Sequence, residues 1–168
     1  MYVHALRGDT AHATKLVVWG QSLGAGVATF VAGHAAKQSI RIDGLILETP
    51  FVSVKEMLVT LYPQRWLPYF YLSPFLWNHW DSEVGLERIG QGDFKPAVLV
   101  LSADKDELVP LAHANRLADL CLINGCEVLH SKVAGALHTE ALLKLQGQLA
   151  VTRFIAKILA RSRSPNLM

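Results

Sequence analysis

The chain has 168 residues, which is enough for a single domain with a buried core. Apolar residues make up 51% of it and charged residues only 18%. The net charge is +2 and the basic residues are scattered, so the composition excludes a nucleic-acid-binding face. Two cysteines, Cys121 and Cys126, lack the spacing of a metal or redox motif and are expected to be reduced packing groups in the core.

Four short apolar segments are predicted as strands, and helical periodicity separates them. The strands are predicted at 15–19, 44–48, 97–102 and 127–133, and the helices at 23–37, 110–122 and 139–160. This alternation predicts an α/β fold, in which a parallel sheet carries helices on both faces. The last strand alternates apolar and polar residues, as expected at a sheet edge.

A long aromatic and proline-rich segment, 51–94, interrupts this alternation. Its apolar content predicts a lid of short helices inserted into the single domain, 1–168. No signal peptide opens the sequence, and no apolar run reaches the length of about 18 residues that a membrane span needs. The sequence does not indicate a cellular compartment for the protein.

The most informative motif is the G-x-S-x-G pentapeptide at 20–24, which has Ser22 at its centre. It follows an apolar strand and precedes a helical pattern. This arrangement lifts a serine hydroxyl out of the sheet on a sharp turn, where it can act as a nucleophile. The glycines supply the backbone freedom and the space that the turn requires.

A serine nucleophile needs a base, and the base needs an acid that orients it. His138 lies in the loop after the strand at 127–133, and Asp106 follows the strand at 97–102. Both positions are at the carboxyl edge of a parallel sheet, where Ser22 also lies. The order serine, aspartate, histidine is the one expected for this kind of fold.

Other residues compete for these two roles. Asp104 and Glu107 share the acidic loop with Asp106, and Glu48 at the end of the second strand is expected to be a capping or salt-bridging group. Asp106 is favoured because it lies one turn before the helix that begins near Pro110. The remaining histidines fit the base less well because none is placed just after a strand: His4, His12, His34, His79, His113 and His130.

The sequence resembles the α/β-hydrolase superfamily, in particular its ABHD-type serine hydrolases. The resemblance rests on four ordered segments: 17–29 around the pentapeptide, 45–51, 96–110 and His138. It implies that Ser22 is the nucleophile, Asp106 the acid and His138 the base, and that the backbone N–H of Leu23 is one oxyanion donor. It implies no metal and no organic cofactor, because acyl transfer through a serine needs neither.

The sequence also departs from the family pattern. Family members carry four further strands before the nucleophile and a His-Gly motif whose loop supplies the second oxyanion donor, whereas here the first predicted strand begins at Lys15 and no His-Gly pair occurs. We therefore expect an incomplete α/β-hydrolase fold, limited to its four C-terminal strands. The segment 15–19 would be an exposed apolar edge, either covered by another chain or marking a fragment of a longer enzyme, and we favour the fragment.

The expected function is a serine hydrolase (EC 3.1 class, esterase or lipase-like) that cleaves carboxylic or thio-esters of lipid-like acyl groups through an acyl-enzyme intermediate. Alternatives are an impaired or non-catalytic fragment that binds a partner, and a serine peptidase of the same fold. A flavodoxin-like nucleotide binder is disfavoured because the glycines match no phosphate-binding motif. Expected partners are an acyl ester or lipid, a membrane surface through the lid, and another chain through the strand edge. Related family members often carry an N-terminal membrane anchor.

Overall fold

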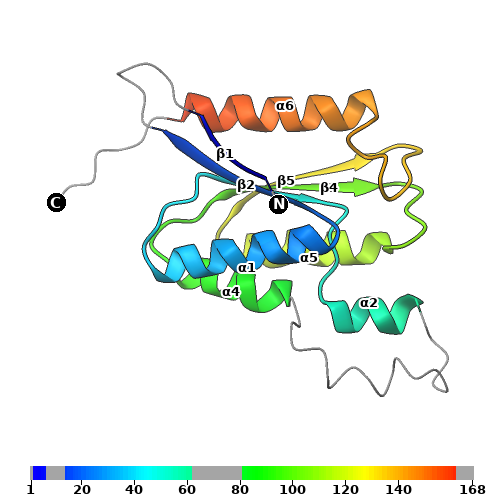
Figure 1. Cartoon of the computed structure of the whole chain (residues 1–168), viewed down its shortest axis with the longest axis horizontal. Helices are drawn as coiled ribbons and strands as arrows, with labels where there is room; N and C mark the ends of the chain where they lie inside the picture. The colour runs from blue at the N-terminus through cyan, green and yellow to red at the C-terminus, as the bar shows by residue number, and fades with distance from the viewer. Residues whose placement is uncertain (1, 7–13, 62–80, 162–168) are drawn as a thin grey trace.

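A five-stranded sheet with helices on both faces forms the centre of the molecule (Figure 1). The structure is a computed structural model that describes residues 2–6, 14–61 and 81–161, the backbone alone being described at 2–6 and 58–61. Its elements are β1 (Tyr2–Leu6), β2 (Lys15–Gln21), α1 (Leu23–Lys37), β3 (Gly44–Glu48), α2 (Val54–Leu61), α4 (Ser82–Gln91), β4 (Ala97–Ala103), α5 (Leu111–Ile123), β5 (Glu127–Val133) and α6 (Leu145–Ala160).

Strands β2 to β5 are parallel and lie in sequence order, which confirms the predicted parallel sheet. The register aligns Gln21 with Glu48 and Glu48 with Leu101, so the carboxyl ends of these strands meet at one edge. The predicted strands 44–48 and 127–133 match β3 and β5 at both ends. Strand β5 is the last in the sheet order, as its alternating pattern predicts.

The prediction that 15–19 would be an exposed edge is wrong. Strand β1 pairs with β2 in antiparallel orientation, and the register runs from Tyr2 opposite Trp19 to Leu6 opposite Lys15. A short extended segment satisfies the backbone groups that β2 would otherwise leave unpaired. The sheet therefore contains one antiparallel strand beside the four parallel ones.

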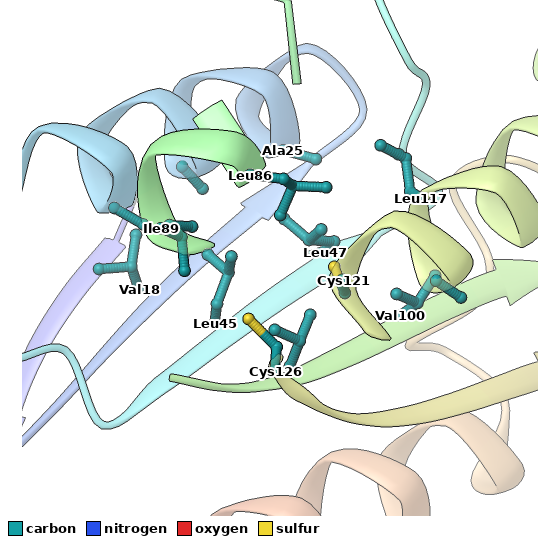
Figure 2. Close-up of a cluster of buried hydrophobic side chains, with 14 of the residues drawn as sticks. Val18, Ala25, Leu45, Leu47, Leu86, Ile89, Val100, Leu117, Cys121 and Cys126 are labelled. Carbon is teal, nitrogen blue, oxygen red and sulfur yellow. The ribbon is translucent and has the colours of Figure 1, made fainter. Parts of the chain in front are cut away.

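The two faces of the sheet bury different sets of side chains, as the alternation of a strand requires. One cluster lies between the sheet and helices α1, α4 and α5, and Figure 2 shows Leu45, Leu47 and Val100 from the strands facing Leu86 and Leu117 from the helices. Both cysteines belong to this cluster as free, buried thiols, which confirms the prediction. The opposite face is covered by α6 (Figure 1).

Helices α1 and α4 pack closely because small residues meet between them. A Cβ added at Gly33 would lie 2.8 Å from the carbonyl oxygen of Gly85, and one added at Gly85 would lie 2.8 Å from Cγ2 of Thr29. Such distances leave no room for a larger side chain. Helix α4 also contributes Leu86 and Ile89 to the core, although it belongs to the segment 51–94 that was expected as a lid.

Hydrogen bonds join the start of α4 to the residues just before α2. The N–H of Ser82 donates to the carbonyl of Val52 at 2.9 Å, and its hydroxyl donates to the carbonyl of Phe51 at 3.3 Å. Residues 62–80, which include most of the aromatic residues of the expected lid, lie outside the described residues. The hydrogen bonds of Ser82 therefore hold together the two ends of the segment 53–81, which includes α2.

The last helix begins later than its periodicity predicts. Residues 139–144 form turns, and α6 starts at Leu145 rather than near 139. A Cβ at Gly147 would overlap the carbonyl oxygen of Ala141, so these turns fold back against the first turn of α6. Among the helices of the described ranges, none combines the length and the apolarity needed to cross a bilayer.

Candidate active site

Ser22 lies on a strained turn between β2 and α1. Its backbone has φ 51° and ψ −117°, a conformation rarely adopted by residues other than glycine. Two hydrogen bonds hold the turn: Ser22 N–H donates to the carbonyl of Glu48 at 2.8 Å, and Ala25 N–H donates to the carbonyl of Ser22 at 2.9 Å. The predicted strand–turn–helix context of the pentapeptide is therefore present.

The two glycines of the pentapeptide differ in what they allow. A Cβ at Gly20 would overlap the backbone carbonyl of Gly24, so only glycine fits where the strand turns back on the helix. A Cβ at Gly24 would meet no atom within 4 Å. The close approach of the end of β2 to the first turn of α1 therefore depends on Gly20, whereas Gly24 lies in open space.

The first turn of α1 provides a local positive potential beside Ser22. Leu23 is the first helical residue, so no carbonyl of α1 precedes it to accept its N–H. The first turn contains no acidic side chain that would offset the partial positive charge of the helix terminus. The side chain of Leu23 is 52% exposed at this edge of the sheet.

Asp106 and His138 form a buried pair, although 32 residues separate them in the sequence. The Nδ1 atom of His138 lies 2.9 Å from Oδ2 and 3.0 Å from Oδ1 of Asp106, and both side chains are at most 6% exposed. Oδ1 also accepts the N–H groups of Leu108 at 3.0 Å and Val109 at 2.7 Å. These bonds hold the Asp106 carboxylate in place. They engage Nδ1 of the imidazole and do not involve Nε2.

The competing acids of the same loop have other partners. Asp104 forms an ion pair with Lys132 at 2.9 Å, and the hydrogen bond from Lys132 holds the pKa of this carboxyl below its usual value. Glu107 accepts the backbone N–H of His138 at 3.0 Å, which likewise lowers its pKa. Of these three acids, only Asp106 contacts the imidazole of His138 in the described part of the chain.

Glu48 is a buried carboxylate at the same edge of the sheet, and its contacts differ from those expected. Its side chain accepts the indole N–H of Trp19 at 3.2 Å and the amide of Gln21 at 3.5 Å, and the backbone N–H of Leu142 also donates to it. Burial raises the pKa of Glu48, while these hydrogen bonds and the nearby His138 oppose the shift. The only sequence signal was a glutamate ending a strand that is otherwise apolar.

Two other histidines with described side chains, His113 and His130, make hydrogen bonds within the scaffold. His113 of α5 accepts the backbone N–H of Val52 at 3.3 Å through Nδ1, and burial lowers its pKa. His130 of β5 lies with Nε2 3.1 Å from the hydroxyl of Ser102. In the ranges that the structure describes, no group of three or more histidine, cysteine, aspartate or glutamate side chains is arranged to hold a metal ion.

Sequence comparison finds curated relatives that align with most of the chain. Protein bem46 of Schizosaccharomyces pombe is 39% identical over 108 residues, which is 64% of this chain and 33% of the relative. Lysophosphatidylserine lipase ABHD12 of Danio rerio is 33% identical over 116 residues, which is 62% of this chain and 28% of the relative. No protein-family model matches the chain.

Solved structures show the same fold. An α/β-hydrolase from Vibrio vulnificus superposes with a TM-score of 0.62 at 20% identity, covering 86% of this chain and 49% of that one. An esterase from Rhizomucor miehei gives a TM-score of 0.57 at 19% identity, with coverages of 84% and 48%.

In sequence and in fold, this chain resembles the ABHD-type α/β-hydrolases. It carries the parallel sheet and the covering helices of that fold. The aligned segment spans about a third of the length of the curated relatives, at 33% of bem46 and 28% of the fish ABHD12. The activity of such a hydrolase and the roles of its residues are inferred below.

Proposed function

We propose that this ABHD-type chain is an ester hydrolase in which Ser22 attacks the substrate, His138 transfers the proton and Asp106 orients His138. The observation that carries the proposal is the buried His138–Asp106 pair at the sheet edge where Ser22 occupies a strained turn. Ser22 follows β2, Asp106 follows β4 and His138 follows β5. Strain of this kind is typical of residues whose position matters for chemistry.

In the first half-reaction, the Oγ of Ser22 forms a bond to the ester carbonyl carbon as its proton passes to Nε2 of His138. The Nδ1–H of the imidazolium donates to Asp106, whose carboxylate balances the new charge. The tetrahedral intermediate collapses as the bond to the leaving group breaks. His138 then gives its proton to the departing alcohol or thiol, and an acyl ester of Ser22 remains.

In the second half-reaction, His138 takes a proton from water while the water oxygen bonds to the acyl carbon. The bond between the acyl group and Ser22 breaks, and His138 returns the proton to Oγ. The products are a carboxylic acid and the free enzyme. These steps need only the side chains named here and a water molecule.

The oxyanion of the intermediate is stabilised in this proposal by the N–H of Leu23 at the start of α1. A second donor normally comes from a His-Gly loop, and this sequence contains no His-Gly pair. Loss of one oxyanion donor lowers turnover by about 10² to 10³. We therefore expect slow turnover when this chain acts by itself.

Lipid-like acyl esters are the substrate class that the surroundings favour. Three exposed leucines adjoin site residues in the sequence: Leu23 beside Ser22, Leu137 beside His138, and Leu108 two residues after Asp106. Relatives include a lysophosphatidylserine lipase, and structural neighbours include esterases and an acyl-protein thioesterase. In this proposal the part of the insertion 51–94 that precedes α4 provides the lid over the acyl chain and the contact with a lipid surface, because α4 itself belongs to the core.

A fluorophosphonate probe and p-nitrophenyl esters of increasing chain length test this function. The probe should label the wild-type chain and the Ser131→Ala variant, which changes a serine of β5, and should not label Ser22→Ala. Ester hydrolysis should follow the same pattern and should be faster for longer acyl chains. Folded wild-type protein that neither reacts with the probe nor cleaves an ester would contradict the proposal, and cleavage of peptides in preference to esters would favour the peptidase.

A further inference from the structure

We propose that Glu48 is a positioning residue for His138: a second buried carboxylate that balances the charge of the imidazolium and holds the loop carrying it. The kinetic part of this inference rests on the proposed function, whereas the electrostatic part does not. Asp106 contacts the ring directly, so the role assigned to Glu48 differs from that of the acid.

The location of Glu48 connects it to both sides of the site. It is the last residue of β3, between the strand that leads to Ser22 and the strand that leads to Asp106. Its carbonyl accepts the N–H of Ser22 at 2.8 Å, so its backbone is part of the serine turn. Its side chain accepts the N–H of Leu142, four residues after His138. One residue thus holds the nucleophile turn and the histidine loop.

The hydrogen bonds of the Glu48 carboxyl are those of an anion. Trp19, Gln21 and Leu142 all donate to it, and a carboxylate accepts hydrogen bonds without donating any. The residue is only 4% exposed, so water does little to screen its charge. A buried carboxylate is costly unless donors or an opposite charge compensate it. The nearby His138, once protonated, supplies that opposite charge.

Two carboxylates bond to His138, and Glu48 interacts with it electrostatically. Asp106 bonds Nδ1, and Glu107 accepts the backbone N–H of His138 at 3.0 Å. Glu48 acts on the ring through space: in the described residues no hydrogen bond joins the two side chains, and the charge of His138 lowers the pKa of Glu48. When Ser22 transfers its proton, the ring becomes a cation. A third nearby negative charge stabilises that state more than the neutral state that precedes it.

Carbon-13 NMR of the glutamate carboxyl groups tests the pairing without requiring activity. Burial raises the pKa of Glu48, and the positive charge of His138 partly opposes this rise. Replacing His138 by glutamine should therefore raise the pKa of Glu48 further. The matched control is His130→Gln, which changes a histidine of β5 and should leave this titration unchanged. The Glu48→Gln spectrum assigns the resonance.

Steady-state kinetics test the positioning role. Glu48→Gln keeps an acceptor for Trp19 and removes the charge, so kcat should fall about tenfold with little change in KM. Glu48→Asp should restore part of the loss, and Glu87→Gln, on the exposed face of α4, should behave as wild type.

Two results would overturn the inference: a Glu48 titration that is the same with and without His138, or an active wild type whose kcat is unchanged by Glu48→Gln. If the wild type cleaves no ester, the proposed function fails and the NMR titration still decides whether Glu48 and His138 are coupled.

Discussion

The Nδ1 atom of His138 lies 2.9 Å from Oδ2 of Asp106, and the backbone N–H groups of Leu108 and Val109 hold the other oxygen of that carboxylate. The Asp106 carboxylate is thus held by its own loop as well as by His138. An acid held in this way selects one tautomer of the imidazole and leaves Nε2 able to accept a proton.

Replacing Asp106 by asparagine should lower kcat/KM for an activated ester by about 10⁴-fold, because the amide no longer holds the required tautomer. The control is Asp104→Asn, which removes an exposed carboxylate that pairs with Lys132. The kcat/KM of this control should stay within about twofold of wild type, since an exposed surface ion pair contributes little to stability. Equal losses in both variants would show that the loop charge, rather than the contact with His138, matters for activity.

The two glycines beside Ser22 should tolerate alanine very differently. Gly20→Ala should destabilise the chain by about 3 kcal/mol or more, because the new Cβ overlaps the carbonyl of Gly24 and cannot relax. Gly24→Ala should change the free energy of unfolding by no more than about 0.5 kcal/mol, since nothing lies within 4 Å of its Cβ. Urea unfolding of both variants measures the difference, and similar values would contradict the described turn.

The stability of the chain should decrease at acidic pH in a way that depends on His113. Burial lowers the pKa of His113 in the folded state, so the unfolded state binds more protons once the pH falls below about 6.5. Its contribution to stability is therefore fully present above that pH and is lost as the pH falls. Because an asparagine at this position does not titrate and can still accept the N–H of Val52, His113→Asn should lose less stability than wild type between pH 7 and pH 5.

Thermal unfolding at several pH values measures that difference. Comparison of the two proteins is necessary because Glu48, whose pKa is raised by burial, contributes in the opposite direction over the acidic range. Parallel melting-temperature curves for the two proteins would show that His113 is not responsible.

Both cysteines should resist thiol reagents in the folded protein. Burial raises the pKa of Cys126 to about 11 and also raises that of Cys121, so few thiolates form at neutral pH. Reaction with an aromatic disulfide reagent should be slow in buffer and should yield two thiols per chain in denaturant. Rapid reaction of the native protein would mean that the cluster shown in Figure 2 opens readily.

Local sequence patterns determine much of this fold, and tertiary contacts determine the rest. Strands β3 and β5 follow from a buried apolar run and from strict alternation. The start of α6 could not be predicted, because periodicity extends through residues 139–144 and the close contact of Gly147 with Ala141 is not local information. Strand β1 was missed because a five-residue extended segment acquires its structure by pairing with β2.

The candidate site shows the same division. Ser22 was evident because its motif specifies a backbone geometry. Asp106 was favoured over Asp104 and Glu107 by its position one turn before α5, and the direction of its side chain toward His138 now distinguishes it from both. Glu48 was undervalued because its burial and its donors, Trp19 and Leu142, come from other segments. A charged residue at the end of a fully apolar strand is the feature that could have indicated it.

The paired hydrogen bonds of Ser82 with Phe51 and Val52 have a consequence for how such a chain can vary. They fix the entry and exit of the intervening segment at a constant separation, so the spacing of β3 and β4 does not depend on what the segment contains. Because the entropic cost of closing a loop increases slowly with its length, segments of quite different size could be exchanged there at little cost. The proposed lid is therefore also the part of the chain that evolution or an engineer can replace without disturbing the sheet edge that carries Ser22, Asp106 and His138.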